Sequence, residues 1–179
     1  VTIVAANVDL PTPIGSTVID VESAEQLRAE MLARYTDVDI VIMAAAVADF
    51  RPRESTSHKI KKTDDSSVPV IELERTPDIL VELVQSRGGQ SRPVIIGFAA
   101  ETGDATASVL EHGRAKLARK GCDLLVVNDV SSGKVFGRDD NEVVILGPAL
   151  EAVEIAHASK TQIAGAILDR VLELAKGSI

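Results

Sequence analysis

Residues 39–46 read DIVIMAAA, residues 93–98 read PVIIGF and residues 123–127 read DLLVV. Each stretch is apolar almost throughout, which is typical of a strand that is buried on both faces of a parallel sheet. Helical patterns of roughly 10–16 residues alternate with the strands, and this alternation favours an α/β fold. We therefore expect a three-layer, Rossmann-like, doubly wound fold whose mainly parallel sheet carries a small antiparallel extension.

Local signals predict helices at residues 24–35, 76–87, 105–120 and 160–176. Ser23 and Gln26 form a capping box at the start of the first helix. Thr76 as cap and Pro77 at the first position mark the start of the second helix. Ser159 caps the last helix in the same way, so three of these helices have a recognisable beginning.

The remaining strands are expected at residues 1–6, 16–21, 68–73, 141–146 and 152–155. Pro69 assigns its strand to an edge or to an extension outside the main sheet, and the last two strands read as an antiparallel pair. The chain opens directly on a strand, whereas a doubly wound domain usually opens with a strand, a Gly-rich turn and a helix. We therefore expect that an N-terminal strand and its Gly turn are missing from these residues.

The composition limits the possible functions. The chain has 179 residues, 45% of them hydrophobic, which is enough for one packed domain over residues 1–179. The net charge of −8 argues against broad binding to nucleic acids or anionic membranes, and 2% aromatic residues are too few for base stacking. The longest uncharged apolar run, 40–48, is about half of the roughly 20 residues that a membrane span needs. Cys122, the single cysteine, is expected to be a core residue in a reduced, cytoplasmic setting.

Acidic and amide residues follow the buried strands. Asp49 follows the first strand, Glu101 the second, and Asn128 and Asp129 the third. In an open parallel sheet, ligands bind outside the carboxyl ends of the strands, where these groups could bind ribose hydroxyls or a metal ion. The pattern indicates a nucleotide-like ligand, and ordinary capping of turns and helices is the alternative that the residues leave open.

Lysines provide the second group of candidates. Residues 59–62 read KIKK beyond the first buried strand, where a basic loop could neutralise a triphosphate. Lys116 and Lys120 are four residues apart on one helix, so an anion between them would offset their repulsion. Ordinary solvated charges are the alternative for both groups. The helix start at residues 77–80 adds main-chain amides that could bind an anion, although Asp78 there also suits the helix dipole.

The patterns of several other sites are absent. The chain has no GxGxxG and no GxxxxGK[ST] motif. His58, His112 and His157 lack metal-ligand spacing to one another and to Cys122, so the metal ligands stay unassigned. Tyr35 has no lysine four residues on, which removes the Tyr/Lys pair of a short-chain dehydrogenase.

Four blocks carry a resemblance to a known family. They are AAAVADFRP at 44–52 followed by HKIKK at 58–62, ERTPDIL at 74–80, GFAAET at 97–102, and LLVVNDVS at 124–131. With Lys116 and Lys120 between the last two, their order and spacing resemble the phosphopantothenate–cysteine ligase family, also called phosphopantothenoylcysteine synthetase. The likeness is to the form that follows a flavin-dependent decarboxylase in a bacterial bifunctional protein, and it covers nearly the whole chain.

The resemblance implies a reaction of coenzyme A biosynthesis. The carboxylate of 4'-phosphopantothenate attacks the α-phosphorus of CTP, with Mg²⁺ present, and gives an acyl-cytidylate and pyrophosphate. The amine of L-cysteine then attacks the acyl carbon and releases CMP. The resemblance also implies a cytoplasmic homodimer with residues 68–73 in its dimer-forming extension, and a decarboxylase domain in the full-length protein. The choice of CTP over ATP rests on the likeness to the bacterial form.

The resemblance further assigns roles to single residues. The residues expected to bind the nucleotide are Ala45, Asp49, Lys59, Pro77, Asp78, Ile79, Leu80, Phe98, Lys116 and Lys120. Lys59 matches the lysine that forms the acyl-cytidylate and is the expected catalytic residue. Residues 77–80 should act through main-chain groups, and Ala45 should leave space beside the ligand.

The family also carries a Gly turn and an Asn-bearing segment before the strand at residues 1–6. An asparagine of that segment helps to handle the acyl-cytidylate, so the chain without it is expected to bind CTP and to need those residues for activity. Two other functions stay open at this point. One is a non-catalytic nucleotide-binding module. The other is a fragment of a nicotinamide-dependent oxidoreductase, and the absence of the Tyr/Lys pair argues against it.

Overall fold

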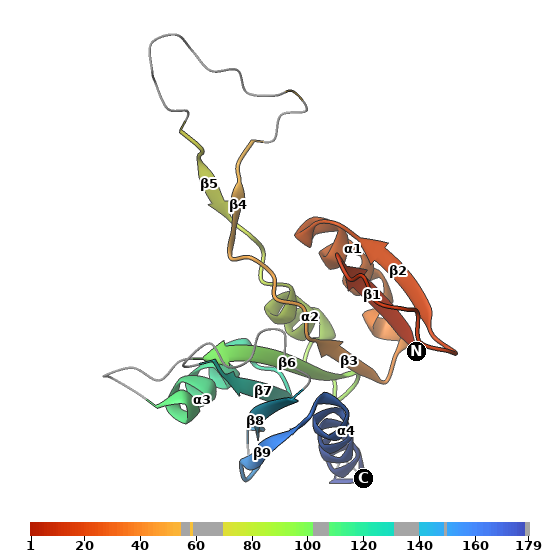
Figure 1. The fold of residues 1–179 in the computed structure, drawn as a ribbon, viewed down its shortest axis with the longest axis vertical. Coiled ribbons are helices and arrows are strands. Elements are labelled where there is room, and N and C mark those ends of the chain that lie inside the picture. Colours follow the sequence, from red (N-terminus) through yellow and green to blue (C-terminus); the bar gives the residue numbers. More distant parts are fainter. Residues whose placement is uncertain (55–57, 59–69, 102–107, 131–139, 149, 178–179) are drawn as a thin grey trace. The chain divides into compact units, whose positions relative to one another are not determined.

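The computed structural model describes residues 1–54, 58, 70–101, 108–130, 140–148 and 150–177 (Figure 1). The chain divides into two compact units. The first unit comprises Val1–Leu27 and Ala46–Asp78, and the second comprises Arg28–Ala45 and Ile79–Ile179. Among the helices of the described ranges, none combines the length and the apolar character that a membrane crossing needs.

A five-stranded sheet forms the centre of the second unit. Its order is β3 (Ile40–Met43), β6 (Val94–Glu101), β7 (Leu124–Asp129), β8 (Asp140–Leu146) and β9 (Val153–Ser159). The β3–β6 and β6–β7 pairs are parallel, and the β7–β8 and β8–β9 pairs are antiparallel. The sheet therefore confirms the expected parallel centre, and its two last strands confirm the expected antiparallel pair.

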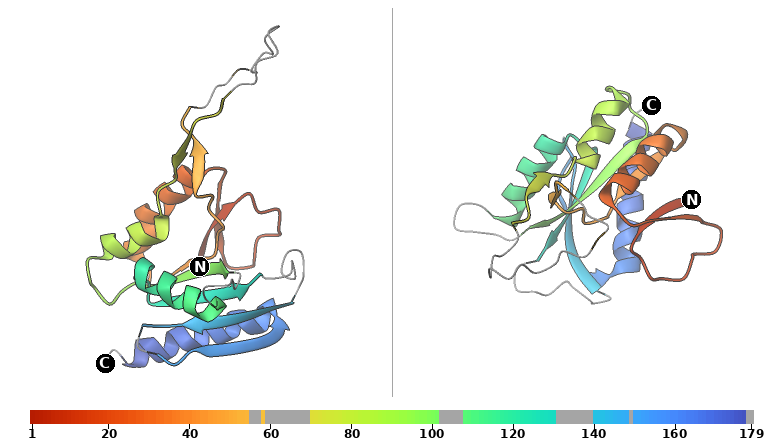
Figure 2. Two further views of the ribbon diagram at one scale, coloured as in Figure 1. Left: turned by 90° about the vertical axis from the view of Figure 1, so that its left-hand side faces the viewer. Right: turned by 90° about the horizontal axis from the view of Figure 1, so that it is seen from above.

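Helices cover both faces of this sheet, as Figure 2 shows. On one face lie α2 (Ile79–Arg87) and α3 (Val109–Lys120), where the Leu80 side chain packs against Gly97 of β6. On the other face, α4 (Lys160–Gly177) contributes Ile163, Ile167 and Val171 to a buried cluster. The strands supply the other buried members of this cluster, which are Val94, Ile96, Leu124, Val126, Val143 and Ile145. Two helical layers thus enclose one sheet, which confirms the three-layer α/β class.

The first unit contains two small sheets. β1 (Thr2–Ala6) and β2 (Thr17–Val21) pair in parallel, and Thr2 lies opposite Thr17. β4 (Phe50–Pro52) and β5 (Leu73–Arg75) pair in antiparallel fashion as a separate ladder. This agrees with the expected extension outside the main sheet, but the predicted bounds 68–73 were wrong, since β5 begins at Leu73 and residues 70–72 are not in a strand. Positions 68 and 69 lie outside the described residues.

Capping confirms two of the predicted helix starts. At α1 (Ala24–Arg34), the Gln26 amide donates to Ser23 Oγ at 3.2 Å, and the Ser23 amide donates to Gln26 Oε1 at 3.0 Å. The same exchange joins Ser159 to Gln162 at the start of α4. A 3-10 turn, Tyr35–Asp37, follows α1.

Two other helix starts were predicted wrongly. α2 begins at Ile79 rather than after a Thr76 cap, because the Thr76 amide donates to Asp49 O at 2.9 Å and so extends the β4–β5 ladder. α3 begins at Val109, with Ser108 as its cap, whereas the prediction began at residue 105. Positions 105–107 of that prediction lie outside the described residues.

The edge strand β3 differs most from its prediction. The apolar run predicts burial on both faces, and β6 and β7 meet this expectation. In β3, however, Val41 and Met43 are 4% and 8% exposed, whereas Ile40 and Ile42 are 36% and 43% exposed. Burial on both faces was therefore wrong for β3, because the described residues of the second unit cover only one of its faces.

Candidate functional site

The carboxyl ends of the parallel strands meet at one edge of the sheet in the second unit. β6 ends at Glu101 and β7 at Asp129, and these two residues are partners in the register of the ladder. β3 runs parallel to them and is followed by Ala45, which is exposed. The structure therefore confirms that the ends of the parallel strands β3, β6 and β7 converge at one edge, where an open parallel sheet binds ligands.

An ion pair marks this edge. Lys116 Nζ of α3 contacts Glu101 Oε1 at the end of β6, and the two side chains are 28% and 17% exposed. Glu101 Oε1 is buried and, among the residues that the structure describes, has no hydrogen-bond partner besides this ion-pair contact. The sequence indicated Glu101 and Lys116 separately, because a strand end and a helix 15 residues further on give no signal of their pairing.

Close packing fixes α3 and hence the position of Lys116. A Cβ atom on Gly113 would lie 2.9 Å from Val127 Cγ2 and 3.0 Å from Leu146 Cδ1, so the helix lies very near the sheet. Leu117, next to Lys116, is buried. Because these contacts leave α3 little room to move, its position on the sheet is fixed. Lys116 and Lys120 are four residues apart and lie on the same side of this helix.

Both ends of α3 are capped. The Ser108 amide donates to Glu111 Oε2 at 2.8 Å, and this backbone bond, together with one from the Ser108 hydroxyl, lowers the pKa of Glu111. At the other end, Gly121 adopts a left-handed conformation with φ of 69°, and its amide donates to Leu117 O at 2.9 Å. Lys120 is thus held in the last turn of a well-defined helix.

The start of α2 contributes main chain rather than side chains. Ile79 and Leu80 are buried, and a Cβ on Gly97 would lie 2.6 Å from Leu80 Cδ2. Their side chains therefore belong to the core, and what they can offer a ligand is the amides of a helix N-terminus. This geometry is compatible with the main-chain role expected for residues 77–80.

Phe98 lies on the other face of the sheet. It is half-buried and packs against the cluster that α4 covers, whereas Gly97 and Glu101 of the same strand face α2 and α3. Only the exposed part of Phe98 is available to a ligand. Within the second unit, the structure therefore brings Glu101 and Lys116 together and separates Phe98 from them by the thickness of the sheet.

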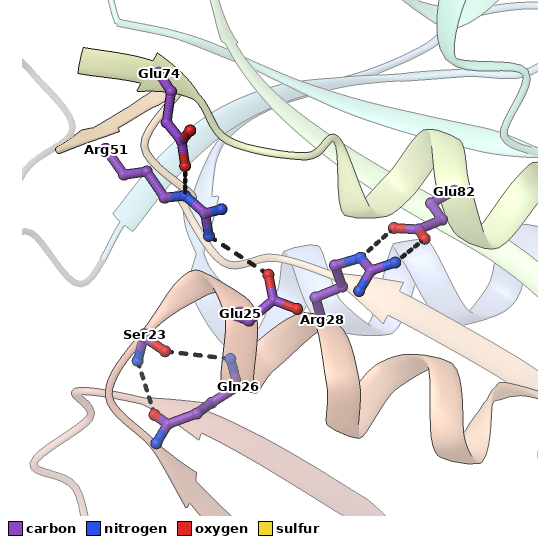
Figure 3. Close-up of polar contacts among 7 residues, drawn as sticks. All are labelled: Ser23, Glu25, Gln26, Arg28, Arg51, Glu74 and Glu82. Atoms are coloured by element: carbon purple, nitrogen blue, oxygen red, sulfur yellow. Dashed lines mark hydrogen bonds and ion pairs between the residues drawn. The ribbon is translucent and has the colours of Figure 1, made fainter. Parts of the chain in front are cut away.

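In the first unit, a polar network holds the base of the β4–β5 ladder (Figure 3). Arg51 Nε donates to Glu74 Oε1 at 2.7 Å, and Arg51 Nη1 lies 3.5 Å from Glu25 Oε2. The hydrogen bond from Arg51 to Glu74 raises the pKa of Arg51 further. Next along the ladder, the Thr76 amide donates a hydrogen bond to Asp49 O. This bond brings Asp49 beside the segment that leads to Pro77 and Asp78. Lys59, the expected catalytic residue, lies outside the described residues.

Cys122 has a structural role. Cys122 is fully buried, and burial raises the pKa of its thiol to about 11, which confirms it as a core residue. Within the described ranges, no group of three or more His, Cys, Asp or Glu side chains could hold a metal ion.

Comparison with known proteins identifies the family. The sequence model of the DNA/pantothenate metabolism flavoprotein C-terminal domain matches residues 1–174. The chain belongs to this family. The coenzyme A biosynthesis bifunctional protein CoaBC of Mycobacterium tuberculosis is 43% identical over 181 residues, and the match covers 99% of this chain and 43% of that protein. This member of the family therefore spans less than half the length of the relatives it matches.

Solved structures agree with the family assignment. A crystal structure of the C-terminal domain of CoaBC superposes with a TM-score of 0.74 at 31% identity, and covers 98% of this chain and 74% of that one. A Cab2 variant in complex with phosphopantothenate-cysteine has the same fold, with a TM-score of 0.67 at 20% identity, over 91% of this chain and 55% of that one. The comparisons confirm the resemblance and the fold, and the nucleotide-binding residues stay predictions.

Proposed function

We propose that this domain is a phosphopantothenoylcysteine synthetase, which joins 4'-phosphopantothenate to L-cysteine with CTP as the activating nucleotide. One observation carries the proposal: a chain 43% identical to CoaBC proteins over 99% of its length carries the Glu101–Lys116 pair at the carboxyl edge of its parallel sheet. The complex of Cab2, a protein of the same fold, contains the product of this reaction type.

The proposed reaction has two steps. A carboxylate oxygen of phosphopantothenate bonds to the α-phosphorus of CTP, and the bond from that phosphorus to the bridging oxygen breaks to release pyrophosphate. The cysteine nitrogen then bonds to the acyl carbon and loses a proton, while the acyl C–O bond breaks and CMP leaves. Because a free carboxylate is a poor electrophile, the nucleotide supplies the leaving group, and the protein aligns the reactants and stabilises phosphate charge.

The lysines of α3 are proposed to bind the phosphates of CTP. Lys116 is held at the carboxyl edge by Glu101, and a triphosphate would compete with this carboxylate for the ammonium group of Lys116. Lys120 lies one turn further along the same side of α3. Lys59 is proposed as the residue that forms the acyl-cytidylate, and Asp49, Ala45 and Phe98 as further nucleotide contacts.

Magnesium is proposed as the companion of CTP rather than as a resident cofactor. Mg²⁺ is usually held by substrate phosphates with one or two carboxylates, and the described residues contain no cluster that would cage it. Its chemistry would be to neutralise phosphate charge.

The first unit supports a proposed homodimer. Apolar side chains along the β4–β5 ladder and the residues just before β5 are exposed, namely Phe50, Val70, Ile71 and Leu73. A two-stranded ladder is marginal by itself, so pairing with a second copy would stabilise it. We also propose that the protein is cytoplasmic. The full-length protein is proposed to contain a flavin-dependent decarboxylase domain.

The decisive test is release of pyrophosphate from CTP by the full-length protein. Release should depend on phosphopantothenate, and Lys59→Gln should abolish it, while Lys160→Gln at the exposed start of α4 should leave it unchanged. Equal rates for Lys59→Gln and the unmodified protein would contradict the assignment. A thermal-shift comparison of CTP, ATP, UTP and GTP tests the choice of base, because the selected nucleotide stabilises the folded state.

Binding of CTP tests the ion pair separately. Lys116→Gln should weaken binding by about tenfold or more, because a charge-assisted contact contributes about 1.5–3 kcal/mol. Glu101→Gln should tighten binding severalfold, because it removes a competing negative charge beside Lys116. Calorimetric titration with CTP measures both, and unchanged affinity in Lys116→Gln would remove α3 from the proposed site.

A further inference from the structure

Two asparagines form a chain of hydrogen bonds at the carboxyl edge of the sheet in the second unit. The Glu142 amide donates to Asn141 Oδ1 at 2.8 Å, and Asn141 Nδ2 donates to Asn128 Oδ1 at 3.2 Å. Asn128 lies near the end of β7, and Asn141 lies near the start of its antiparallel neighbour β8. The contacts proposed above for CTP involve neither side chain.

These bonds fix how the Asn128 amide is turned. An asparagine amide has an oxygen that accepts and a nitrogen that donates, and its partners determine which of the two faces them. Because the Glu142 amide can only donate, it holds the oxygen of Asn141 and leaves Asn141 Nδ2 to face Asn128. Asn128 must then offer its own oxygen to Asn141. Its Nδ2 group is therefore turned away from this bond, and no acceptor within the described ranges bonds it.

The Asn128 side chain lies on the face of the sheet that α4 covers. Leu124 and Val126 of the same strand belong to the buried cluster under α4, and alternation along the strand places Asn128 on that face. Its partner in the β6–β7 ladder is Ala100, which is exposed and follows Phe98 by two residues. On β6 the cluster thus ends at Phe98, and the small side chain of Ala100 leaves space beside the half-buried Asn128.

The ion pair of the proposed site lies directly across this edge. Ala100 precedes Glu101, whose carboxylate contacts Lys116 on the face that α3 covers. A ligand that is bound at Lys116 and continues over the edge therefore meets the amide of Asn128. The cation of Lys116 suits a phosphate, whereas a neutral N–H donor suits a neutral acceptor such as a carbonyl oxygen. The two faces thus offer contacts to different parts of a substrate.

We propose that Asn128 determines specificity in the ligase reaction by donating from Nδ2 to a neutral acceptor of a substrate, and that Asn141 is the positioning residue that keeps this donor turned outward. The acceptor is a carbonyl-type group, which two substrates offer: CTP in its pyrimidine base and phosphopantothenate in its amide. The inference rests on the proposed function, because that function supplies the substrates. An Asn128 amide turned the other way would present an oxygen and repel the same acceptor.

Two measurements on the full-length protein distinguish these sources. Calorimetric titration with CTP alone reports contact with the base, and KM for phosphopantothenate at saturating CTP reports contact with the amide. Asn128→Ala should weaken at least one of them by about three- to tenfold, as expected for loss of one hydrogen bond. Asn141→Ala should weaken the same one by about twofold, because the Asn128 amide then has two orientations of similar population.

Two further variants separate recognition from stability. Tyr35→Phe removes a hydrogen bond of similar length, from Tyr35 Oη to Ser86 O at 3.0 Å, at the amino-terminal end of the sheet, and should change neither value. Asn128→Asp still accepts from Asn141 but presents no donor. It should lose at least as much as Asn128→Ala, whereas a merely structural role would be preserved by it. If Asn128→Ala does not fold, Asn128→Asp carries the test.

The outcomes separate this inference from the proposed function. Turnover with CTP affinity and KM unchanged in the Asn128 variants overturns the inference alone, because the Asn128–Asn141 bond would then only join β7 to β8. Equal losses in Tyr35→Phe overturn it as well, since a loss of stability would account for them. If the ligase assignment is wrong, the unmodified protein itself releases no pyrophosphate from CTP in the presence of phosphopantothenate.

Discussion

The sheet of the second unit and the β4–β5 ladder of the first unit are stabilised in opposite ways. In the sheet, Leu125 and its neighbours are fully buried between helices. In the ladder, apolar side chains such as Leu73 are exposed, and the polar pairs Arg51–Glu74 and Arg53–Glu72 cross between the strands. Each region therefore responds to a different kind of substitution.

The difference follows from desolvation. A buried apolar side chain contributes about 1.5–3 kcal/mol through loss of contact with water, whereas an exposed ion pair contributes about 0–1 kcal/mol. The second unit can therefore hold α3 and its lysines rigidly at the edge of the sheet. The ladder cannot reach the same stability by ion pairs alone, in keeping with the proposed contact with a second copy.

The largest expected effect comes from truncating the core. Leu125→Ala should destabilise the protein by about 2–5 kcal/mol, because it removes a fully buried side chain and leaves a cavity. Leu73→Ala in the ladder removes the same atoms from an exposed side chain and should cost less than about 0.5 kcal/mol in a monomer. Urea unfolding of both variants measures the difference, and equal losses would show that the ladder has a core of its own.

An intermediate effect is expected at the amino-terminal end of the sheet. The Arg87 side chain is 9% exposed, contacts Asp123 Oδ2 and donates to Pro93 O at 2.9 Å. Asp123 Oδ2 also accepts from the Ile95 amide at 2.7 Å, so this pair joins α2, β6 and the start of β7.

Arg87→Ala should therefore cost about 1.5–3 kcal/mol, since it leaves the partly buried carboxylate of Asp123 without its cation. Arg53→Ala removes the cation of an exposed pair in the ladder and should cost about 0–1 kcal/mol. Thermal unfolding at neutral pH compares them, and a larger loss for Arg53→Ala would reverse the contrast between the two regions.

The sequence predicted the sheet well because its signals are local. The uncharged runs of β6 and β7 and the caps at Ser23 and Ser159 each act within a few residues. The burial of β3 could not be predicted in this way, because β3 has the same pattern as β6. Whether Ile40 and Ile42 are covered depends on which segment lies beside them in space.

The candidate site was predictable in its location but not in its pairing. The carboxyl ends of parallel strands lie at one edge of a sheet, so Glu101 and Asp129 could be placed there. The spacing of Lys116 and Lys120 likewise places both on one side of a helix. The contact between Glu101 and Lys116 depends on how closely α3 approaches the sheet. Gly113 sets that approach, and a single glycine within a helix gives no sequence signal of what it lies against.

The smallest effect expected is a pH dependence at α1 and α2. Arg28 Nε donates to Glu82 Oε2 at 2.6 Å, and a second contact joins Nη2 to Oε1 (Figure 3). The hydrogen bond from Arg28 lowers the pKa of Glu82 below its ordinary value of 4.5. A carboxyl group whose pKa is lower in the folded state stabilises that state above the unfolded value, and the contribution is lost as the pH falls through the folded value.

Glu82→Gln should therefore lower Tm slightly at pH 7, and the difference from the unmodified protein should shrink below about pH 4.5 and vanish at lower pH. Glu72→Gln, which removes the acid of the exposed Arg53 pair in the ladder, should leave Tm nearly unchanged at both pH values. Thermal unfolding between pH 3 and pH 7 follows both variants. A Tm difference for Glu82→Gln that grows on acidification would mean that the pKa of Glu82 is raised rather than lowered, and that Arg28 does not stabilise its charge.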